Sequence, residues 1–251
     1  MTGRLFVVGL GPGDYTMLTG QAQAALQAAD VIIGYTGYVT WVEPLLDSQE
    51  RLALPLTQET ERARLAVERL LQGAVVCVIS SGDAGIYGMA SLIFEVLAQH
   101  GAEALLSNVV VIPGISAINA CAALLGAPLG HDFAVISLSD LLTPWERIER
   151  RLAAAADADF VTVLLNPKSA RRHWQYARAQ DILAQRRVPT TPVGIVRNAY
   201  RPEQAIAITT VAAMGEAQVD MLTTVIVGNS QTRRFQTCMV TPRGYTLAEA
   251  R

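Results

Sequence analysis

Residues 75–88, VVCVISSGDAGIYG, decide the fold class of this chain. Five apolar residues, four of them β-branched, open the stretch and are typical of a fully buried strand. Small residues and glycines follow, and residues 89–98 have helix character. A buried strand that opens through a Gly-rich loop into a helix is the usual ligand-binding edge of an α/β sheet, since small residues let a ligand approach the backbone. Taken alone, this loop is equally well interpreted as an ordinary turn between a strand and a helix.

Strand and helix patterns alternate along the rest of the chain. Apolar, mostly β-branched runs predict strands at residues 5–9, 31–34, 75–79, 109–112, 133–137, 160–165, 192–196 and 223–228. Helical patterns lie between them at residues 19–29, 59–71, 89–98, 117–125, 144–156 and 170–186. The alternation predicts an α/β fold with a mostly parallel sheet.

A segment rich in Gly and Pro, residues 126–132, interrupts this pattern and has the composition of a link between domains. The 251 residues are enough for one large domain or two small ones. We therefore expect two α/β domains, residues 1–127 and 128–251.

Three local features refine these boundaries. Ser116 is expected to cap the helix that ends at Leu125. Thr143 is expected to cap the next helix, with Pro144 in its first turn. The tail from Arg233 onward is expected to form a hairpin or an extended segment.

The composition predicts a soluble cytoplasmic protein. The chain is 51% hydrophobic with a mean hydropathy of +0.29, but Gly, Asp, Ser or Pro breaks every apolar run before it could span a bilayer. The first four residues lead directly into a strand, so no signal peptide is expected. Cys77, Cys121 and Cys238 are isolated, with no disulfide or metal-ligand spacing. We expect buried thiols in a reducing compartment and no bound metal.

Positive charge is unevenly distributed, although the formal net charge is only −2. No Lys or Arg occurs from Leu70 to Trp145, and nearly all the basic residues beyond are Arg, which pairs bidentately with carboxylate or phosphate. Solvated helix faces explain some of these residues, and a polyanionic ligand is the sharper interpretation. Nucleic acid is not favoured, because interleaved aromatics and a basic pI are missing. The basic residues are Arg147, Arg150, Arg151, Lys168, Arg171, Arg172, Arg178, Arg186, Arg187, Arg197, Arg201, Arg233, Arg234 and Arg243.

The loop after the first strand, GLGPGD at residues 9–14, invites comparison with the dinucleotide-binding fingerprint. The fingerprint fails at its third glycine, where Asp14 stands, and Pro12 removes a backbone N–H. A carboxylate and a missing donor are unfavourable neighbours for a pyrophosphate. The loop therefore favours a ligand without phosphate, and a nucleotide-binding oxidoreductase stays as an alternative.

Four loops in order form a wider pattern: VGLGPGD at 8–14, GDAGIYG at 82–88, PGISA at 113–117 and TPVGIV at 191–196. Together they resemble the tetrapyrrole (corrin/porphyrin) methylase family, which uses S-adenosylmethionine (SAM) in corrin and sirohaem synthesis. The resemblance covers essentially the whole chain. A narrower resemblance to members that methylate precorrin-3B at C17 lies in GY at 34–35 with YV at 38–39, SLSDLLTPW at 137–145, LNPKS at 165–169 and VRNA at 196–199.

The resemblance implies two α/β domains of the tetrapyrrole methylase type, with SAM in the cleft between them, and a homodimer. SAM would be held largely by backbone groups. Plain core positions are the alternative interpretation for Ile86, Ala117 and Ile195. The cofactor-binding residues carried over by motif are Pro12, Gly82, Asp83, Ala84, Ile86, Ser116, Ala117, Asn166, Gly194 and Ile195.

The resemblance also implies methylation of precorrin-3B at C17 with ring contraction to precorrin-4, in cobalamin synthesis. Methyl transfer from SAM needs alignment rather than a protein nucleophile. Contraction requires removal of a proton from a ring hydroxyl. Candidate bases are Asp14, Asp83 and Asp140, each of which could instead cap a helix or turn. Arg197 and Arg201 are the candidate partners of the substrate carboxylates.

Two positions depart from the family pattern. Ala84 stands where Pro is usual, which would make the loop less rigid, and Leu165 stands where Tyr is frequent, which removes a hydroxyl. Two further alternatives stay open: a SAM methylase of another tetrapyrrole such as cobalt-factor III, and a non-catalytic carboxylate-binding module.

Overall fold

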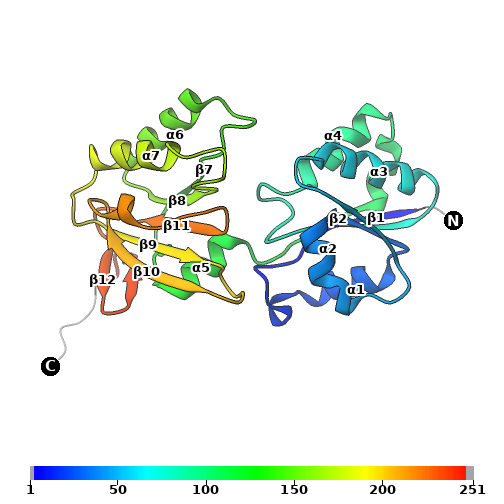
Figure 1. The fold of residues 1–251 in the computed structure, drawn as a ribbon, viewed down its shortest axis with the longest axis horizontal. Helices are drawn as coiled ribbons and strands as arrows, with labels where there is room; N and C mark the ends of the chain where they lie inside the picture. Colours follow the sequence, from blue (N-terminus) through cyan, green and yellow to red (C-terminus); the bar gives the residue numbers. More distant parts are fainter. Residues whose placement is uncertain (1–2, 247–251) are drawn as a thin grey trace. The chain divides into compact units, whose positions relative to one another are not determined.

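The computed structural model describes residues 3–246 (Figure 1). The chain divides into two compact units, Met1–Ala117 and Ile118–Arg251, each with its own five-stranded sheet. The expectation of no signal peptide rests partly on Met1 and Thr2, which lie outside the described residues. Within the described part of the chain, none of the helices has the length and apolar character needed to cross a bilayer.

The first unit has a sheet of order β3-β2-β4-β1-β5 in which every pair is parallel, as predicted. Its α1 and α2 pack on one face, and α3 and α4 pack on the other (Figure 1). The sequence pattern predicts neither β3 nor α2. The elements are β1 (Arg4–Gly9), α1 (Gly20–Ala28), β2 (Val31–Tyr35), α2 (Thr36–Val42), β3 (Glu50–Leu54), α3 (Glu59–Leu71), β4 (Val75–Ser80), α4 (Ala90–Gln99) and β5 (Val109–Ile112), with 3-10 helices at Tyr15–Met17, Glu43–Leu45 and Glu103–Asn108.

The central strand of this sheet is β4, the buried strand of the opening stretch. Val78 packs in the cluster under α3 and α4, whereas Cys77 and Ile79 pack under α1 and α2. Both faces are therefore covered, which explains the continuous apolar run. Parallel pairing places the carboxyl ends of β1, β4 and β5 at one edge, so the loops that follow them are neighbours.

The second unit has a mixed sheet of order β10-β9-β11-β8-β7 and a small sheet of order β12-β13-β6. Strands β7 and β8 are parallel, but the pairs β8–β11, β11–β9 and β9–β10 are antiparallel. The elements are α5 (Ala117–Leu125), β6 (Gly126–Ala127), β7 (Phe133–Ser137), α6 (Trp145–Asp157), β8 (Val161–Leu165), α7 (Gln175–Ala184), β9 (Pro192–Arg197), β10 (Ala205–Thr210), β11 (Thr223–Val227), β12 (Arg233–Phe235) and β13 (Cys238–Val240), with a 3-10 helix at Met214–Glu216.

The prediction of a mostly parallel sheet is wrong for the second unit, where three of the four strand pairs are antiparallel and β10 was not predicted. This strand follows β9 after a short loop and pairs with it over their full lengths as a hairpin. Parallel neighbours need a long crossover connection, which that loop cannot provide. The tail forms the hairpin β12–β13, as predicted.

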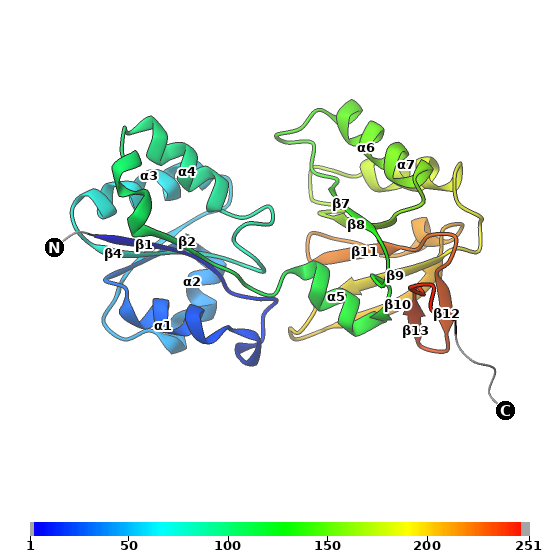
Figure 2. The same cartoon turned by 180° about the vertical axis from the view of Figure 1, so that it is seen from behind.

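Helix α5 follows Ser116 directly and belongs to the second unit, so the units divide after Ala117 rather than at the Gly- and Pro-rich link. The apolar face of α5 packs with β8, β9 and β11 in one buried cluster. Figure 2 shows α5 beside this sheet. A Cβ at Gly194 of β9 would lie 2.4 Å from Leu125 Cδ1, so glycine lets the helix lie close to the strand.

The starts of α6 and α7 differ from the predictions. Pro144 occupies the N-cap of α6 and makes no side-chain capping bond, so Thr143 is not the cap. Helix α7 begins later than predicted because Ser169 Oγ accepts hydrogen bonds from the N–H groups of Arg171 and Arg172. These local bonds offer the backbone an alternative to the helix.

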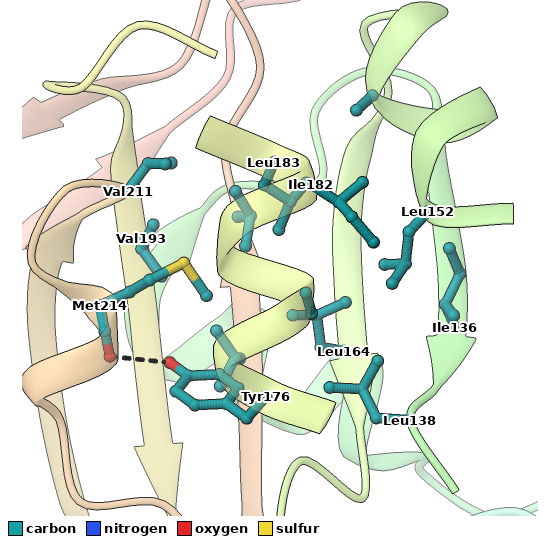
Figure 3. Close-up of a cluster of buried hydrophobic side chains, with 14 of the residues drawn as sticks. Ile136, Leu138, Leu152, Leu164, Tyr176, Ile182, Leu183, Val193, Val211 and Met214 are labelled. Carbon is teal, nitrogen blue, oxygen red and sulfur yellow. Dashed lines mark hydrogen bonds between the residues drawn. The ribbon is translucent and has the colours of Figure 1, made fainter. Parts of the chain in front are cut away.

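The thiols of Cys77 and Cys121 are buried, as predicted, whereas Cys238 is partly exposed. Burial raises the pKa of Cys121 to about 11. A second buried cluster of this unit, besides the one under α5, lies between the sheet and α6 with α7 (Figure 3). In this core the Tyr176 hydroxyl donates to the Met214 carbonyl over 3.0 Å. Ile195 belongs to the same cluster and is 5% exposed.

Candidate functional site

The loops after β1, β4 and β5, residues 10–14, 81–88 and 113–116, form what we call the backbone edge of the first unit. Gly11 and Gly82 exchange two backbone hydrogen bonds of 3.0 and 2.8 Å. A Cβ at Gly114 would lie 2.1 Å from the Gly82 carbonyl oxygen, and one at Gly9 would lie 2.7 Å from the same atom. Glycine is therefore needed here first of all because the loops contact one another.

Seven of the predicted cofactor-binding residues come together at this edge or, in the case of Ala117, directly after it. A Cβ at Gly82 would lie 3.6 Å from Ser116 Cα and 3.7 Å from Ala117 N, so the loop after β4 lies against the last two residues of the same unit. Gly82 also has a positive φ of 64°, which favours glycine. The seven residues are Pro12, Gly82, Asp83, Ala84, Ile86, Ser116 and Ala117.

Within the loop after β4 the residues differ sharply in exposure. Ala84 is fully buried in the core, and its carbonyl accepts a hydrogen bond from Ala90 N over 3.0 Å. Ile86 is 42% exposed and is therefore not a core residue, and Gly85 and Tyr87 are exposed beside it. The most exposed part of the loop is thus Gly85 to Tyr87, and Ala84 is its buried residue.

The two carboxylates of the backbone edge have structural partners. Asp14 Oδ1 accepts hydrogen bonds from the hydroxyl and the N–H of Thr16, over 2.7 and 2.8 Å, and caps the 3-10 helix that follows. These bonds lower the pKa of Asp14. Asp83 joins two loops, since its oxygens accept from Gly85 N over 2.8 Å and from Gly114 N over 3.0 Å. The capping alternative therefore describes what Asp14 does in this structure.

Aromatic side chains from the end of β2 and from α2 lie next to the loop after β4, and they were not among the predicted site residues. Ser81 Oγ donates to the Tyr38 hydroxyl over 2.9 Å, and the rings of Tyr35 and Tyr38 meet edge to face, 5.1 Å apart. The two tyrosines were visible in the sequence. Because α2 was not predicted, however, nothing in the sequence placed them beside the loop after β4.

The loops after β7 and β8, residues 138–144 and 166–172, form what we call the side-chain edge of the second unit. Asn166 has a positive φ of 52°, and its Nδ2 donates to Ser137 Oγ over 3.0 Å. The Asp140 carboxylate accepts from Gln175 Nε2 over 2.9 Å. Arg172 donates to the Asn166 carbonyl over 2.9 Å. In the sequence, Arg172 stood out only as one of many basic residues. Gln175 lies in α7, 35 positions from Asp140, so no local pattern connected these two residues.

The remaining predicted residues lie on β9 or just after it. Gly194 and Ile195 are interior strand residues with neighbours on β10 and β11. The core interpretation of Ile195 is confirmed, since its side chain is buried. Arg197 Nε donates to Asp220 over 2.6 Å, which raises the pKa of Arg197. Arg201 follows in the next loop, where its N–H donates to the Asn198 carbonyl.

This arrangement of loops and strands matches a known family. Residues 4–215 match the Tetrapyrrole (Corrin/Porphyrin) Methylases. The chain belongs to this family. A crystal structure described as the methyltransferase CobJ is similar to this tetrapyrrole methylase with a TM-score of 0.90 and 40% identity, over 96% of this chain and 100% of that chain.

Relatives of this tetrapyrrole methylase carry more specific names. A cobalt-factor III methyltransferase of Priestia megaterium is 50% identical over 98% of this chain, which spans only 46% of that relative. A probable cobalt-factor III C(17)-methyltransferase of Salmonella typhimurium is 46% identical over 97% of this chain and 100% of the relative. A precorrin-3B C(17)-methyltransferase of Sinorhizobium sp is 41% identical over 93% of this chain and 91% of the relative.

Proposed function

We propose that this tetrapyrrole methylase transfers a methyl group from SAM to C17 of precorrin-3B, with ring contraction to precorrin-4, in cobalamin biosynthesis. The observation that carries the proposal is the likeness, over nearly the whole chain, to relatives named for methyl transfer to C17. The Salmonella relative is matched over 100% of its length at 46% identity. The Sinorhizobium relative, which is named for precorrin-3B, is matched over 91% of its length at 41% identity.

The second candidate is the cobalt-containing substrate, cobalt-factor III. It is favoured by the higher identity, 50% and 46%, to the two relatives named for that substrate. Both candidates use the same methyl donor and the same ring position. They differ in whether the macrocycle carries a metal, which a direct comparison of substrates can decide.

The chemistry of the backbone edge fits SAM better than a dinucleotide. The Gly11 N–H already donates to the Gly82 carbonyl, and Pro12 has no N–H, so this loop offers no cradle for a pyrophosphate. SAM carries a sulfonium and an ammonium cation, which the carboxylates of Asp14 and Asp83 would attract. The exposed backbone of Gly85 and the hydroxyl groups of the Tyr38–Ser81 pair add hydrogen-bonding groups.

Each group has a defined role in this proposal. SAM supplies an activated methyl group when it is bound. The backbone edge and Asn166 hold the donor, so that alignment with the substrate carbon provides much of the rate. Asp14, Asp83 or Asp140 accepts the proton of the ring hydroxyl during contraction. Arg197 and Arg201 pair with substrate carboxylates, where the planar guanidinium suits bidentate binding.

The test incubates the purified protein with SAM and either precorrin-3B or cobalt-factor III. We expect one substrate to gain the mass of one methyl group and to show the absorbance of a contracted ring. Calorimetry on the same protein should detect SAM binding near one equivalent per chain and no NAD binding. Tight NAD binding without SAM binding would instead support the oxidoreductase alternative.

A further inference from the structure

Asn166 is held at the end of β8 by two neighbours that belong to the same unit. Its backbone adopts a left-handed conformation with φ of 52°, which Asn tolerates better than most residues. Ser137 Oγ accepts its side-chain N–H over 3.0 Å, and Arg172 binds its carbonyl oxygen over 2.9 Å. The left-handed conformation is therefore held by one hydrogen bond to the side chain of Asn166 and another to its backbone carbonyl.

Arg172 is the central residue of this arrangement. Its guanidinium also donates to Ser139 Oγ and to Met221 Sδ, each over 3.3 Å, so it joins both loops of the side-chain edge. The residue is only 8% exposed, and among residues 3–246 its Nε has no hydrogen-bond partner. Within the same described residues no carboxylate lies within ion-pair distance of Arg172.

Such a cation is unfavourable for stability, because burial of an arginine without an ion pair removes its hydration without full compensation. Burial lowers the pKa of Arg172, and the nearby charge of Asp140 only partly opposes this effect. Apolar side chains could hold the two loops together at lower cost. A buried guanidinium that binds a backbone carbonyl in a strained turn is better explained by a requirement for that turn geometry.

We propose that Arg172 is a positioning residue that holds Asn166 in its left-handed conformation and so shapes the SAM-binding end of β8. This inference rests on the proposed function, which places Asn166 at the cofactor. Arg172 itself does not contact SAM in this proposal. The effect of Arg172 on SAM binding should therefore be large when residue 166 needs these contacts to adopt a positive φ, and small when it adopts a positive φ without them.

The experiment is a double-mutant cycle that uses Arg172→Ala and Asn166→Gly. Glycine reaches positive φ without support, so Arg172→Ala should weaken SAM binding in the wild-type background and much less in the Asn166→Gly background. In the wild-type background we expect SAM affinity to fall about tenfold, which lies within the range of coupling energies for residues of one hydrogen-bond network. KM for SAM should rise while KM for the tetrapyrrole stays unchanged. Arg172→Lys should behave like Arg172→Ala, because a single ammonium cannot replace the fork.

Two variants complete the design. Ser137→Ala removes the other support of Asn166, so it should weaken SAM binding in the wild-type background. In the Asn166→Gly background the effect should be much smaller, because only the hydrogen bond from Ser139 N is then lost. Ser137→Ala also keeps the inference testable if Arg172→Ala does not fold, which thermal melting will show. Arg171→Ala is the matched control, since Arg171 is the exposed neighbour of Arg172.

The outcomes separate this inference from the function on which it rests. Equal losses from Arg172→Ala in both backgrounds would overturn the inference, because Arg172 would then act without Asn166. Wild-type SAM affinity in Arg172→Ala would overturn it as well. A wild-type protein that binds no SAM at all would overturn the proposed function and the inference with it.

Discussion

The backbone edge and the side-chain edge hold their loops in different ways. At the backbone edge, Gly11, Gly82 and Gly114 bring main chains into direct contact, with no room for a Cβ at Gly114. At the side-chain edge, Arg172 and Ser137 hold the loops through hydrogen bonds to Asn166. The first edge should therefore be sensitive to any added atom, and the second to the loss of particular donors and acceptors.

The largest effect should come from adding one methyl group at the centre of the backbone edge. In Gly114→Ala the new Cβ would meet the Gly82 carbonyl oxygen at 2.1 Å, and backbone atoms cannot move aside as a flexible side chain can. We expect the free energy of unfolding to fall by about 4 kcal/mol, measured by chemical denaturation. Gly20→Ala is the control, because nothing lies within 4 Å of its Cβ. Equal stability of the two variants would contradict the contact between the loops.

Asp14→Asn tests whether a carboxylate of the backbone edge has a chemical role besides its capping role. Asn retains the Oδ1 acceptor for Thr16, so stability should be unchanged, but it cannot accept the proton that contraction releases. If Asp14 is the base, contraction should slow by about 100-fold while methylation continues, which product mass and absorbance distinguish. Contraction at the wild-type rate would leave Asp83 and Asp140 as candidates.

Arg197→Ala and Arg201→Ala test whether the second unit binds the substrate. Either change should raise the tetrapyrrole KM by a factor that corresponds to about 1.5–3 kcal/mol, the value of a charge-assisted hydrogen bond, and leave SAM affinity unchanged. Arg197 also pairs with Asp220, so Asp220→Asn is the control for loss of that pair alone. Unchanged kinetics in both variants would show that Arg197 and Arg201 do not bind the substrate carboxylates.

Gly85→Val separates ligand binding from folding at the backbone edge. Gly85 is exposed and is not among the glycines with positive φ, and its Cβ would meet only Asp83 Oδ1, at 3.2 Å. Stability should change by no more than about 1 kcal/mol, whereas a branched side chain over the loop should weaken SAM binding about tenfold. Thermal melting and SAM titration are the measurements. Wild-type SAM affinity in a folded variant would move the cofactor site away from this loop.

The smallest effect should come from pH. Partial burial of Asp220 opposes its ionisation, but hydrogen bonds from Arg197, Thr223 and Leu222 outweigh this and hold its pKa below the usual value. Its contribution to stability is therefore present above the unfolded pKa and is lost as pH falls through the folded pKa. Because the pair is about 40% exposed, with side chains at 38% and 41%, the loss should stay below about 1 kcal/mol. Asp220→Asn should remove this part of the pH dependence in denaturation curves.

Local patterns determined much of the fold. The apolar run of β4 predicted the central strand because both of its faces are covered, and the amphipathic pattern of residues 59–71 predicted the bounds of α3. The loop motifs predicted the family, which the match over residues 4–215 bears out. These features depend on neighbours in the chain, so the sequence contains them directly.

Contacts between distant segments decided the rest. The hairpin of β9 and β10 made the pairing of these strands antiparallel, where parallel pairing was predicted. Helix α5 belongs to the second unit because it packs on β9. Asn166 depends on Arg172 and on Ser137, which precedes it by 29 positions. The sequence by itself determined which strand ends carry small and polar residues. Only the tertiary structure decided which of these residues support one another, because a partner such as Ser137 comes from a separate strand and the loop of Arg172 folds back on Asn166 only in the folded chain.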